Sequence, residues 1–244
     1  MFERPHHQRV AQVLASLDAN LLARSHCLFG GGTAIALRYG EYRESVDIDF
    51  LVSDIDGYRH LRQLLTGNQG LGALARQGSE IQQSAELRAD QYGIRSSVRV
   101  GDIEIKFEIV LEARIELELP GAEDRIGDIA TLTPLDMATS KLLANSDRWA
   151  DDSVFSRDII DLAMMNPGSA LLRRATIKAS RAYGNSIDAD LTKAAEALLA
   201  RPGRMDRCMA VLQMTPSVTP ALLRQRIKAL LPRAPRAESA VIDP

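Results

Sequence analysis

The sequence predicts an α+β fold in which strands and helices alternate first and helices alone follow. An apolar segment and a glycine turn lead through a short apolar helix to a second strand, over residues 27–52. Residues 103–110 alternate strictly between apolar and charged side chains, which is typical of a half-buried strand. After Pro134 the apolar residues recur at helical spacing, and Gly and Pro divide the remainder into separate helices. We therefore expect two domains, residues 1–128 and 129–244.

Periodicity and turn residues define the elements of the first half. Apolar residues at helical spacing predict one amphipathic helix over 6–24. Its first residues, His6 and His7, are expected to be a solvated helix end rather than metal ligands, because no other histidine has ligand spacing to them. The other predicted elements are a strand over 27–29, a helix over 32–39, a strand over 46–52, a turn over 54–57, a helix over 58–65 and strands over 91–100, 103–110 and 113–119.

A change to helical periodicity marks the second half. Thr133 suits a helix cap and Pro134 the first helical position, so a helix is predicted to begin there. Trp149 is expected to pack between the domains rather than to stack on a base. Further helices are predicted over 156–165, 169–181, 187–200, 205–213 and 220–231, with a frayed tail from Pro232.

Bulk composition limits the class of protein. The chain has 244 residues, of which 45% are hydrophobic and 25% charged, as in an ordinary soluble globular protein. No apolar run is long enough to span a bilayer, so we expect no membrane partner. The first residues lack a signal-peptide core, so a cytoplasmic protein is expected. Two distant cysteines exclude both a disulfide framework and a zinc cluster.

Charge is unevenly distributed along the chain, although the net charge is only −2. From Met165 onward there are 13 Lys and Arg against 6 Asp and Glu, whereas the first 164 residues hold 17 against 26. A basic half could hold a polyanion such as RNA. Solvated arginines on helix faces would give the same balance, and both interpretations remain open.

Two carboxylates and a glycine turn carry the most specific chemical signal. Asp47 and Asp49 are two apart in a predicted strand, so both side chains should point to one face of the sheet. Such carboxylates repel and raise each other's pKa unless a cation lies between them, and Mg²⁺ prefers oxygen ligands of this kind. The preceding glycines, at 30–32, offer bare backbone N–H groups at a helix start, where a phosphate would bind. The combination points to nucleotide chemistry.

Together these motifs resemble the nucleotidyltransferase superfamily of the DNA polymerase β type, and within it the AbiEii/AbiGii toxins of type IV toxin–antitoxin and abortive-infection systems. The resemblance covers roughly residues 25–165 and implies a mixed β-sheet nucleotidyltransferase domain flanked by helices, then an all-helical domain. The segments that carry it are Gly30–Thr33, Ser45–Asp49, Lys106–Glu108, Leu132–Ala144, Asp147–Arg148 and Arg157–Leu162.

The resemblance implies a metal site built from carboxylates. Asp47 and Asp49 would ligate Mg²⁺, and Glu108 on a neighbouring strand would be the third acid. The family more often has Asp at this third position, so Glu104 on the same strand face is the alternative.

The resemblance also implies a phosphate site. Lys141 would contact the triphosphate, and Asp158 would support the site or orient Lys141. Arg148 and Asp161 are further candidates. The residues implied to hold the β and γ phosphates through backbone N–H groups and a hydroxyl are Gly31, Gly32 and Thr33.

The expected function is that of a Mg²⁺-dependent toxin that transfers NMP from an NTP such as ATP to an acceptor. The resemblance implies RNA as the acceptor, at the tRNA 3′ end, and neutralisation by a separately encoded antitoxin protein. One alternative is transfer to a small molecule such as an antibiotic, or to a protein side chain. Another is a catalytically degenerate relative that only binds nucleotide, an alternative that the Glu at position 108 keeps open.

Overall fold

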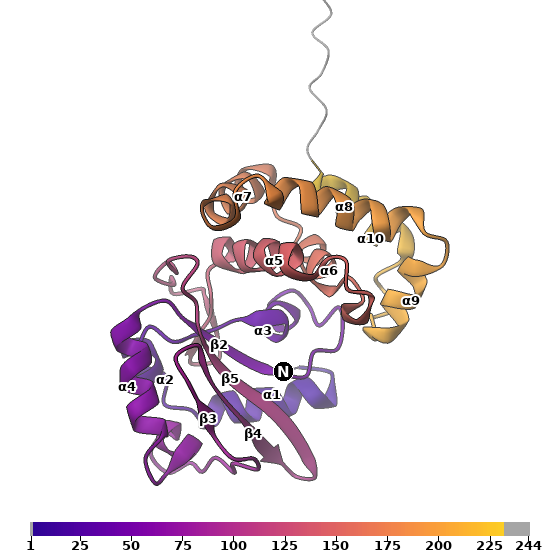
Figure 1. Ribbon diagram of the computed structural model, residues 1–244. Coiled ribbons are helices and arrows are strands. Elements are labelled where there is room, and N and C mark those ends of the chain that lie inside the picture. Colours follow the sequence, from indigo (N-terminus) through magenta and orange to yellow (C-terminus); the bar gives the residue numbers. More distant parts are fainter. Residues whose placement is uncertain (1, 232–244) are drawn as a thin grey trace, which may run out of the picture.

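The computed structural model describes residues 2–231 and confirms the predicted α+β fold (Figure 1). Helices α5 to α10 form a layer of their own, and α3 lies between that layer and the strands (Figure 1). The strands are β1 (Leu28–Phe29), β2 (Ile48–Val52), β3 (Arg88–Ala89), β4 (Gly93–Val100), β5 (Ile103–Leu111), β6 (Arg125–Ile126) and β7 (Ile129–Ala130). The α-helices are α1 (Pro5–Ser16), α2 (Ala19–Arg24), α3 (Gly31–Arg38), α4 (Ile55–Leu65), α5 (Pro134–Arg148), α6 (Arg157–Met165), α7 (Ser169–Tyr183), α8 (Ser186–Ala200), α9 (Arg204–Val211) and α10 (Pro220–Leu230).

A mixed five-stranded sheet, in the order β1-β2-β5-β4-β3, organises the first half of the chain. β2 and β5 are parallel, and the other neighbouring pairs are antiparallel. Phe50 of β2 packs between Phe29 and Phe107, with ring centroids 5.5 and 5.6 Å apart. Because side chains alternate along a strand, this apolar face leaves Asp49 and its register partner Glu108 on the opposite face.

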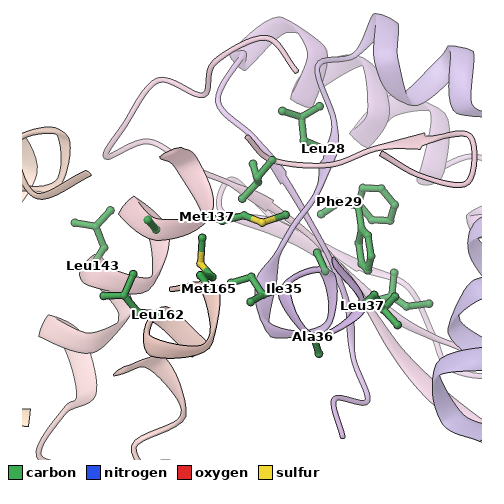
Figure 2. Close-up of a cluster of buried hydrophobic side chains, with 14 of the residues drawn as sticks. Leu28, Phe29, Ile35, Ala36, Leu37, Met137, Leu143, Leu162 and Met165 are labelled. Carbon is green, nitrogen blue, oxygen red and sulfur yellow. The ribbon is translucent and has the colours of Figure 1, made fainter. Parts of the chain in front are cut away.

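Helix α3 joins the sheet to the helical layer. All five of its residues from 33 to 37 are buried. Ile35 lies beside Met165 of α6, with Met137 of α5 close by (Figure 2). Apolar contact on two sides therefore fixes α3, and with it the glycine turn at its start.

The helix predicted over 6–24 is two helices. α1 ends at Ser16, and α2 begins at Ala19. The Asp18 carboxylate accepts hydrogen bonds from the N–H groups of Asn20 and Leu21, both at 2.9 Å, and so caps a new helix. The amphipathic pattern continues across this break, which is why periodicity alone did not separate the two.

The prediction of a strand over 113–119 is wrong, because no residue of that segment is in a strand. The Leu117 N–H donates to Ser53 Oγ at 3.0 Å, and the Glu118 N–H donates to Asp136 Oδ2 at 2.7 Å. Side-chain acceptors thus satisfy the backbone where a neighbouring strand was expected.

The carboxylate strand is shorter than predicted. β2 begins at Ile48, so Asp47 lies in the loop before it, and Val46 is exposed rather than buried. Ile103, at the tip of the β4–β5 hairpin, is also exposed although the alternation placed it on the apolar face.

The helical half agrees with prediction at its start. Thr133 Oγ1 accepts a hydrogen bond from the Asp136 N–H at 3.2 Å, and Pro134 is the first residue of α5.

The proposed domain boundary at residue 128 falls in the turn between β6 and β7. The tail predicted from Pro232 lies outside the described residues. Among residues 2–231, no helix combines the length and apolar character needed to cross a membrane.

Candidate active site

A cavity of about 520 Å³ opens on the polar face of the sheet, and the predicted motifs meet in its wall. The glycine turn, the loop over 43–47, β2, β5 and α5 all contribute residues to it. Residues 211–213, at and beyond the end of α9, close another side, although no motif marked them. The predicted site residues that line the cavity are Gly31, Gly32, Asp47, Asp49, Glu108, Lys141 and Arg148, whereas Thr33, Asp158 and Asp161 do not line it.

The glycine turn is shaped by close approach of charged side chains. Gly31 has a φ of +67°, and Asp49 Oδ2 occupies the space that a Cβ there would need. At Gly32, a Cβ would overlap Nη2 of Arg43. The turn is the start of α3, whose N-cap, Gly30, offers no side chain to its first N–H groups. Bare N–H groups at a helix start beside charged side chains are suited to bind an anion.

Gly31→Ala should weaken nucleotide binding, and Gly40→Ala is the control for the backbone strain of an alanine at positive φ. Both positions have positive φ, so each alanine should destabilise the fold by about 1 kcal/mol. Only at Gly31 would the methyl group displace Asp49, whereas nothing lies within 4 Å of a Cβ at Gly40. Thermal unfolding and nucleotide binding of the two variants compare these effects. Equal nucleotide affinity in both would show that the close approach at Gly31 has no functional role.

Thr33 and Ser45 share one buried hydrogen bond. The Thr33 hydroxyl donates to Ser45 Oγ at 2.8 Å and is buried, so Ser45 rather than Thr33 reaches the cavity wall. The hydroxyl available at the cavity wall is therefore that of Ser45, while Thr33 lies in the first turn of α3.

Three acids converge at the junction of β2 and β5. Asp49 lies directly opposite Glu108 in the parallel ladder, and Asp47 is two residues before Asp49. Burial first, and then the negative charges of Asp47 and Glu108, together raise the pKa of Asp49 to about 6. Ionisation of Asp49 is therefore costly in the folded protein.

Glu108 already has cationic partners. Lys106 Nζ lies 2.8 Å from Oε2, and Arg95 Nε lies 3.3 Å from Oε1. Within residues 2–231, no three His, Cys, Asp or Glu side chains are arranged as a ready metal cluster. Glu104, the alternative third acid, pairs with Arg99 on the exposed hairpin and does not line the cavity.

An ion network with two buried carboxylates includes three cations of the cavity lining, Arg43, Lys141 and Arg148. Asp158 Oδ1 lies 3.0 Å from Lys141 Nζ, so the predicted orienting contact is present. Arg148 donates two hydrogen bonds to Asp158, at 2.7 and 3.0 Å. Lys141 Nζ also lies 2.7 Å from Asp161, to which Arg43 donates two further bonds at 2.6 and 2.9 Å. Three cations share two carboxylates, which leaves one positive charge to meet an anion in the cavity.

The two network carboxylates stay ionised despite burial. Burial alone would raise the pKa of Asp158, but Lys141 and Arg148 outweigh it and hold that pKa well below the usual range. Burial likewise opposes ionisation of Asp161, while Arg43 and Lys141 lower its pKa. Paired charges of this kind are strongly held, because loss of either partner leaves the other buried and unpaired.

Sequence reasoning missed Arg43 and His7. Arg43 lies between the segments Gly30–Thr33 and Ser45–Asp49, four residues before Asp47, but its partner Asp161 is 118 residues away. His7, expected at a solvated helix end, is fully buried, so that expectation is wrong. Trp149 does not line the cavity. The Nζ of Lys193 in α8 lies 5.5 Å from the centroid of its ring.

Comparison with known families decides the class to which this site belongs. The family described as "Nucleotidyl transferase AbiEii toxin, Type IV TA system" matches residues 12–240. The chain belongs to this AbiEii toxin family. An AbiEii protein is a nucleotidyltransferase, and a type IV toxin–antitoxin system implies a separate antitoxin partner. No curated protein sequence matches the chain.

Solved structures share the AbiEii fold seen here. JHP933 from Helicobacter pylori is 16% identical with a TM-score of 0.51, over 94% of this chain and 93% of that one. MenT4, a nucleotidyltransferase toxin from Mycobacterium tuberculosis, is 17% identical with a TM-score of 0.50, over 93% and 84%. At these identities the likeness establishes a common fold. The predicted family is confirmed by the family match over residues 12–240.

Proposed function

We propose that this AbiEii toxin uses Mg²⁺ to transfer NMP from an NTP to RNA, at the 3′ end of tRNA. One observation carries the proposal: the acid pair Asp47 and Asp49 and the cation Lys141 line the same cavity. Arg43 and Arg148 line it too. A metal-binding wall facing a phosphate-binding wall is the arrangement that nucleotidyl transfer requires.

The donor set suits a hard divalent cation. Asp47 and Asp49 offer carboxylate oxygens, and a cation would relieve the repulsion that raises the pKa of Asp49. Glu108 would join them once its contact with Lys106 opens. Mg²⁺ bound there would neutralise charge on the phosphates and lower the pKa of the attacking hydroxyl.

The residues of the chain would act on the phosphates of the nucleotide during transfer. The acceptor hydroxyl oxygen attacks the α-phosphorus, the bond to the α–β bridging oxygen breaks, and pyrophosphate leaves while the hydroxyl proton is lost to water. The first N–H groups of α3 would hold the departing phosphates. Lys141 and Arg148 would stabilise the charge that develops on them, because Asp158 keeps both cations aimed at one place.

A second cavity, of about 720 Å³, supports a polyanionic acceptor. Arg174, Lys178 and Arg181 of α7 are spaced on one helix face and line it. Arg114 lines both this groove and the candidate active site, so the two adjoin at this side chain. Glu116 and Glu118 also line the groove, and Glu118 pairs with Arg174, so the arginines and the lysine would have to outweigh these acids to hold a polyanion.

Charge reversal on α7 should weaken acceptor binding without changing nucleotide affinity. For the variant carrying both Arg174→Glu and Arg181→Glu, we expect the KM for RNA to rise about tenfold and to depend less on salt. Arg173→Glu is the matched control, because Arg173 is exposed on the same helix but does not line the groove. Steady-state kinetics at several salt concentrations would measure this. An equal effect of all three charges would contradict a specific groove.

A labelling experiment separates the proposed acceptor from the alternatives. The protein is incubated with NTP labelled in the α-phosphate, Mg²⁺ and total RNA, and the products are separated by size. We expect label on tRNA. Label on protein or small molecules would replace RNA with another acceptor. Retained nucleotide binding with no transfer to any acceptor would indicate a degenerate relative.

A further inference from the structure

The start of helix α1 is fastened to the loop that carries Asp47. Glu41 accepts hydrogen bonds from the N–H groups of Glu3, at 2.7 Å, and Arg4, at 3.2 Å, which are the two residues just before α1, and so ties the start of this helix to the loop. Arg4 Nε donates back to the Glu41 carbonyl at 3.1 Å. Glu41 adopts a left-handed backbone with φ of +51°, which a non-glycine residue holds only when its surroundings fix it.

His7 extends this attachment into the site. Its imidazole is fully buried, with Nδ1 2.7 Å from Glu41 Oε1. On its other side, the Ser45 backbone N–H donates to Nε2 at 3.1 Å. An N–H can only donate to an unprotonated nitrogen, so the ring is neutral, and its one proton lies on Nδ1 and is donated to Glu41.

Ser45 connects His7 to both parts of the nucleotide site. It is two residues before Asp47 and lines the cavity. Its hydroxyl accepts from Thr33, in the first turn of α3. The next backbone carbonyl, that of Val46, is 3.0 Å from His6 Nε2. The two histidines therefore hold consecutive residues of the loop just before the first carboxylate.

We propose that His7 is a positioning residue for the carboxylate loop, acting through the Ser45 amide. Its neutral ring gives a buried N–H the acceptor that the loop does not supply, and Glu41 fixes the tautomer that makes this possible. The loop can then present Asp47 beside Asp49 while Ser45 supports the glycine turn through Thr33. The kinetic part of the inference rests on the proposed nucleotidyl transfer, whereas the contact with Ser45 does not.

Two substitutions of similar polarity test the hydrogen bonds of the two ring nitrogens of His7 one at a time. His7→Gln can place an amide oxygen near Nε2 and keep an acceptor for Ser45. His7→Asn is shorter, so it can keep a donor near Nδ1 for Glu41 but loses the Ser45 contact. Both remove the imidazole from a buried site, so thermal unfolding should show similar losses of stability.

Kinetics should distinguish the pair. We expect His7→Asn to lower kcat by about 10- to 100-fold with little change in the KM for NTP, and His7→Gln to stay within about threefold of the unsubstituted protein. Equal kcat values in both variants, or a loss that follows the unfolded fraction, would overturn the positioning role.

Hydrogen exchange tests the contact independently of activity. The Ser45 amide should exchange about tenfold faster in His7→Asn than in His7→Gln, because only the latter retains its acceptor. Equal exchange rates would overturn the inference even if the enzyme transfers nucleotides. If the unsubstituted protein shows no transfer, the proposed function fails, and the exchange rates alone decide the role of His7.

Discussion

Asp49→Asn should abolish nucleotidyl transfer and yet make the metal-free protein more resistant to heat. The asparagine cannot bind a metal ion as a carboxylate does, so kcat should fall by about three orders of magnitude. It also removes a buried charge that Asp47 and Glu108 repel. Because burial and repulsion raise the pKa of Asp49 from 3.8 to about 6, the ionised group costs roughly 3 kcal/mol, and partial exposure reduces the expected gain to about 1–2 kcal/mol.

The stability gain of Asp49→Asn should depend on pH, because Asp49 loses its proton at a higher pH in the native state than in the unfolded chain. The native state holds a proton on Asp49 up to about pH 6, whereas the unfolded chain releases it near pH 4. The penalty is therefore absent below pH 4, grows as the pH rises and is complete above about pH 6. Thermal unfolding without metal should show no gain for Asp49→Asn in acid and the full gain at neutral pH.

Glu104→Gln is the matched control for this prediction. It removes a carboxylate from the same sheet, but Glu104 pairs with Arg99 and lies outside the cavity lining. Transfer should be unchanged in this variant. A large loss there, or a lower melting temperature for metal-free Asp49→Asn at neutral pH, would contradict the electrostatic account of the site.

Asp161→Asn should be among the most destabilising single substitutions in the chain. The carboxylate is fully buried and accepts hydrogen bonds from Arg43 and from the Tyr42 hydroxyl, at 2.6 Å, while Lys141 lies 2.7 Å away. The amide would turn a donor toward these cations, leaving buried Arg43 without a carboxylate partner and Lys141 with Asp158 alone, at a cost of about 3–5 kcal/mol. Denaturant unfolding measures the loss directly.

Acid should produce a similar effect in the unsubstituted protein. Arg43 and Lys141 lower the pKa of Asp161 in the native state against the opposing effect of burial, so its contribution is complete above about pH 4 and is lost in stronger acid. The matched control for Asp161→Asn is Asp56→Asn, which removes a carboxylate from an exposed ion pair with Arg59. A loss of less than about 1 kcal/mol in Asp161→Asn would show that the network does not hold the helical layer to the loop.

Local sequence was sufficient for the part of the site that is local in the fold. The glycine turn and the carboxylates are about fifteen residues apart, in a strand–turn–helix–strand unit whose periodicity is clear. That unit folds as predicted, although β2 begins one residue after Asp47. Glu108 required the pairing of β2 with β5, which alternation alone does not specify, and its position came from the family resemblance.

Long-range partners could not be read from the sequence. Nothing in the pattern shows that Arg43 is buried against Asp161, or that His7 accepts a hydrogen bond from Ser45, because each side chain would look equally natural in water. The segment 113–119 illustrates the same limit. Its alternation suits a strand, yet Ser53 and Asp136 take the backbone hydrogen bonds that a neighbouring strand would have made.

The central claim is that the residues of this cavity catalyse transfer of a nucleotidyl group, and not of the γ-phosphoryl group, from the NTP. Parallel reactions with NTP labelled in the α- or the γ-phosphate, run with Mg²⁺ and RNA, test it most directly. We predict α-label on the RNA, γ-label in released pyrophosphate, and neither reaction in Asp49→Asn. The γ-label on the RNA, or equal transfer by the unsubstituted and Asp49→Asn proteins, would contradict the account.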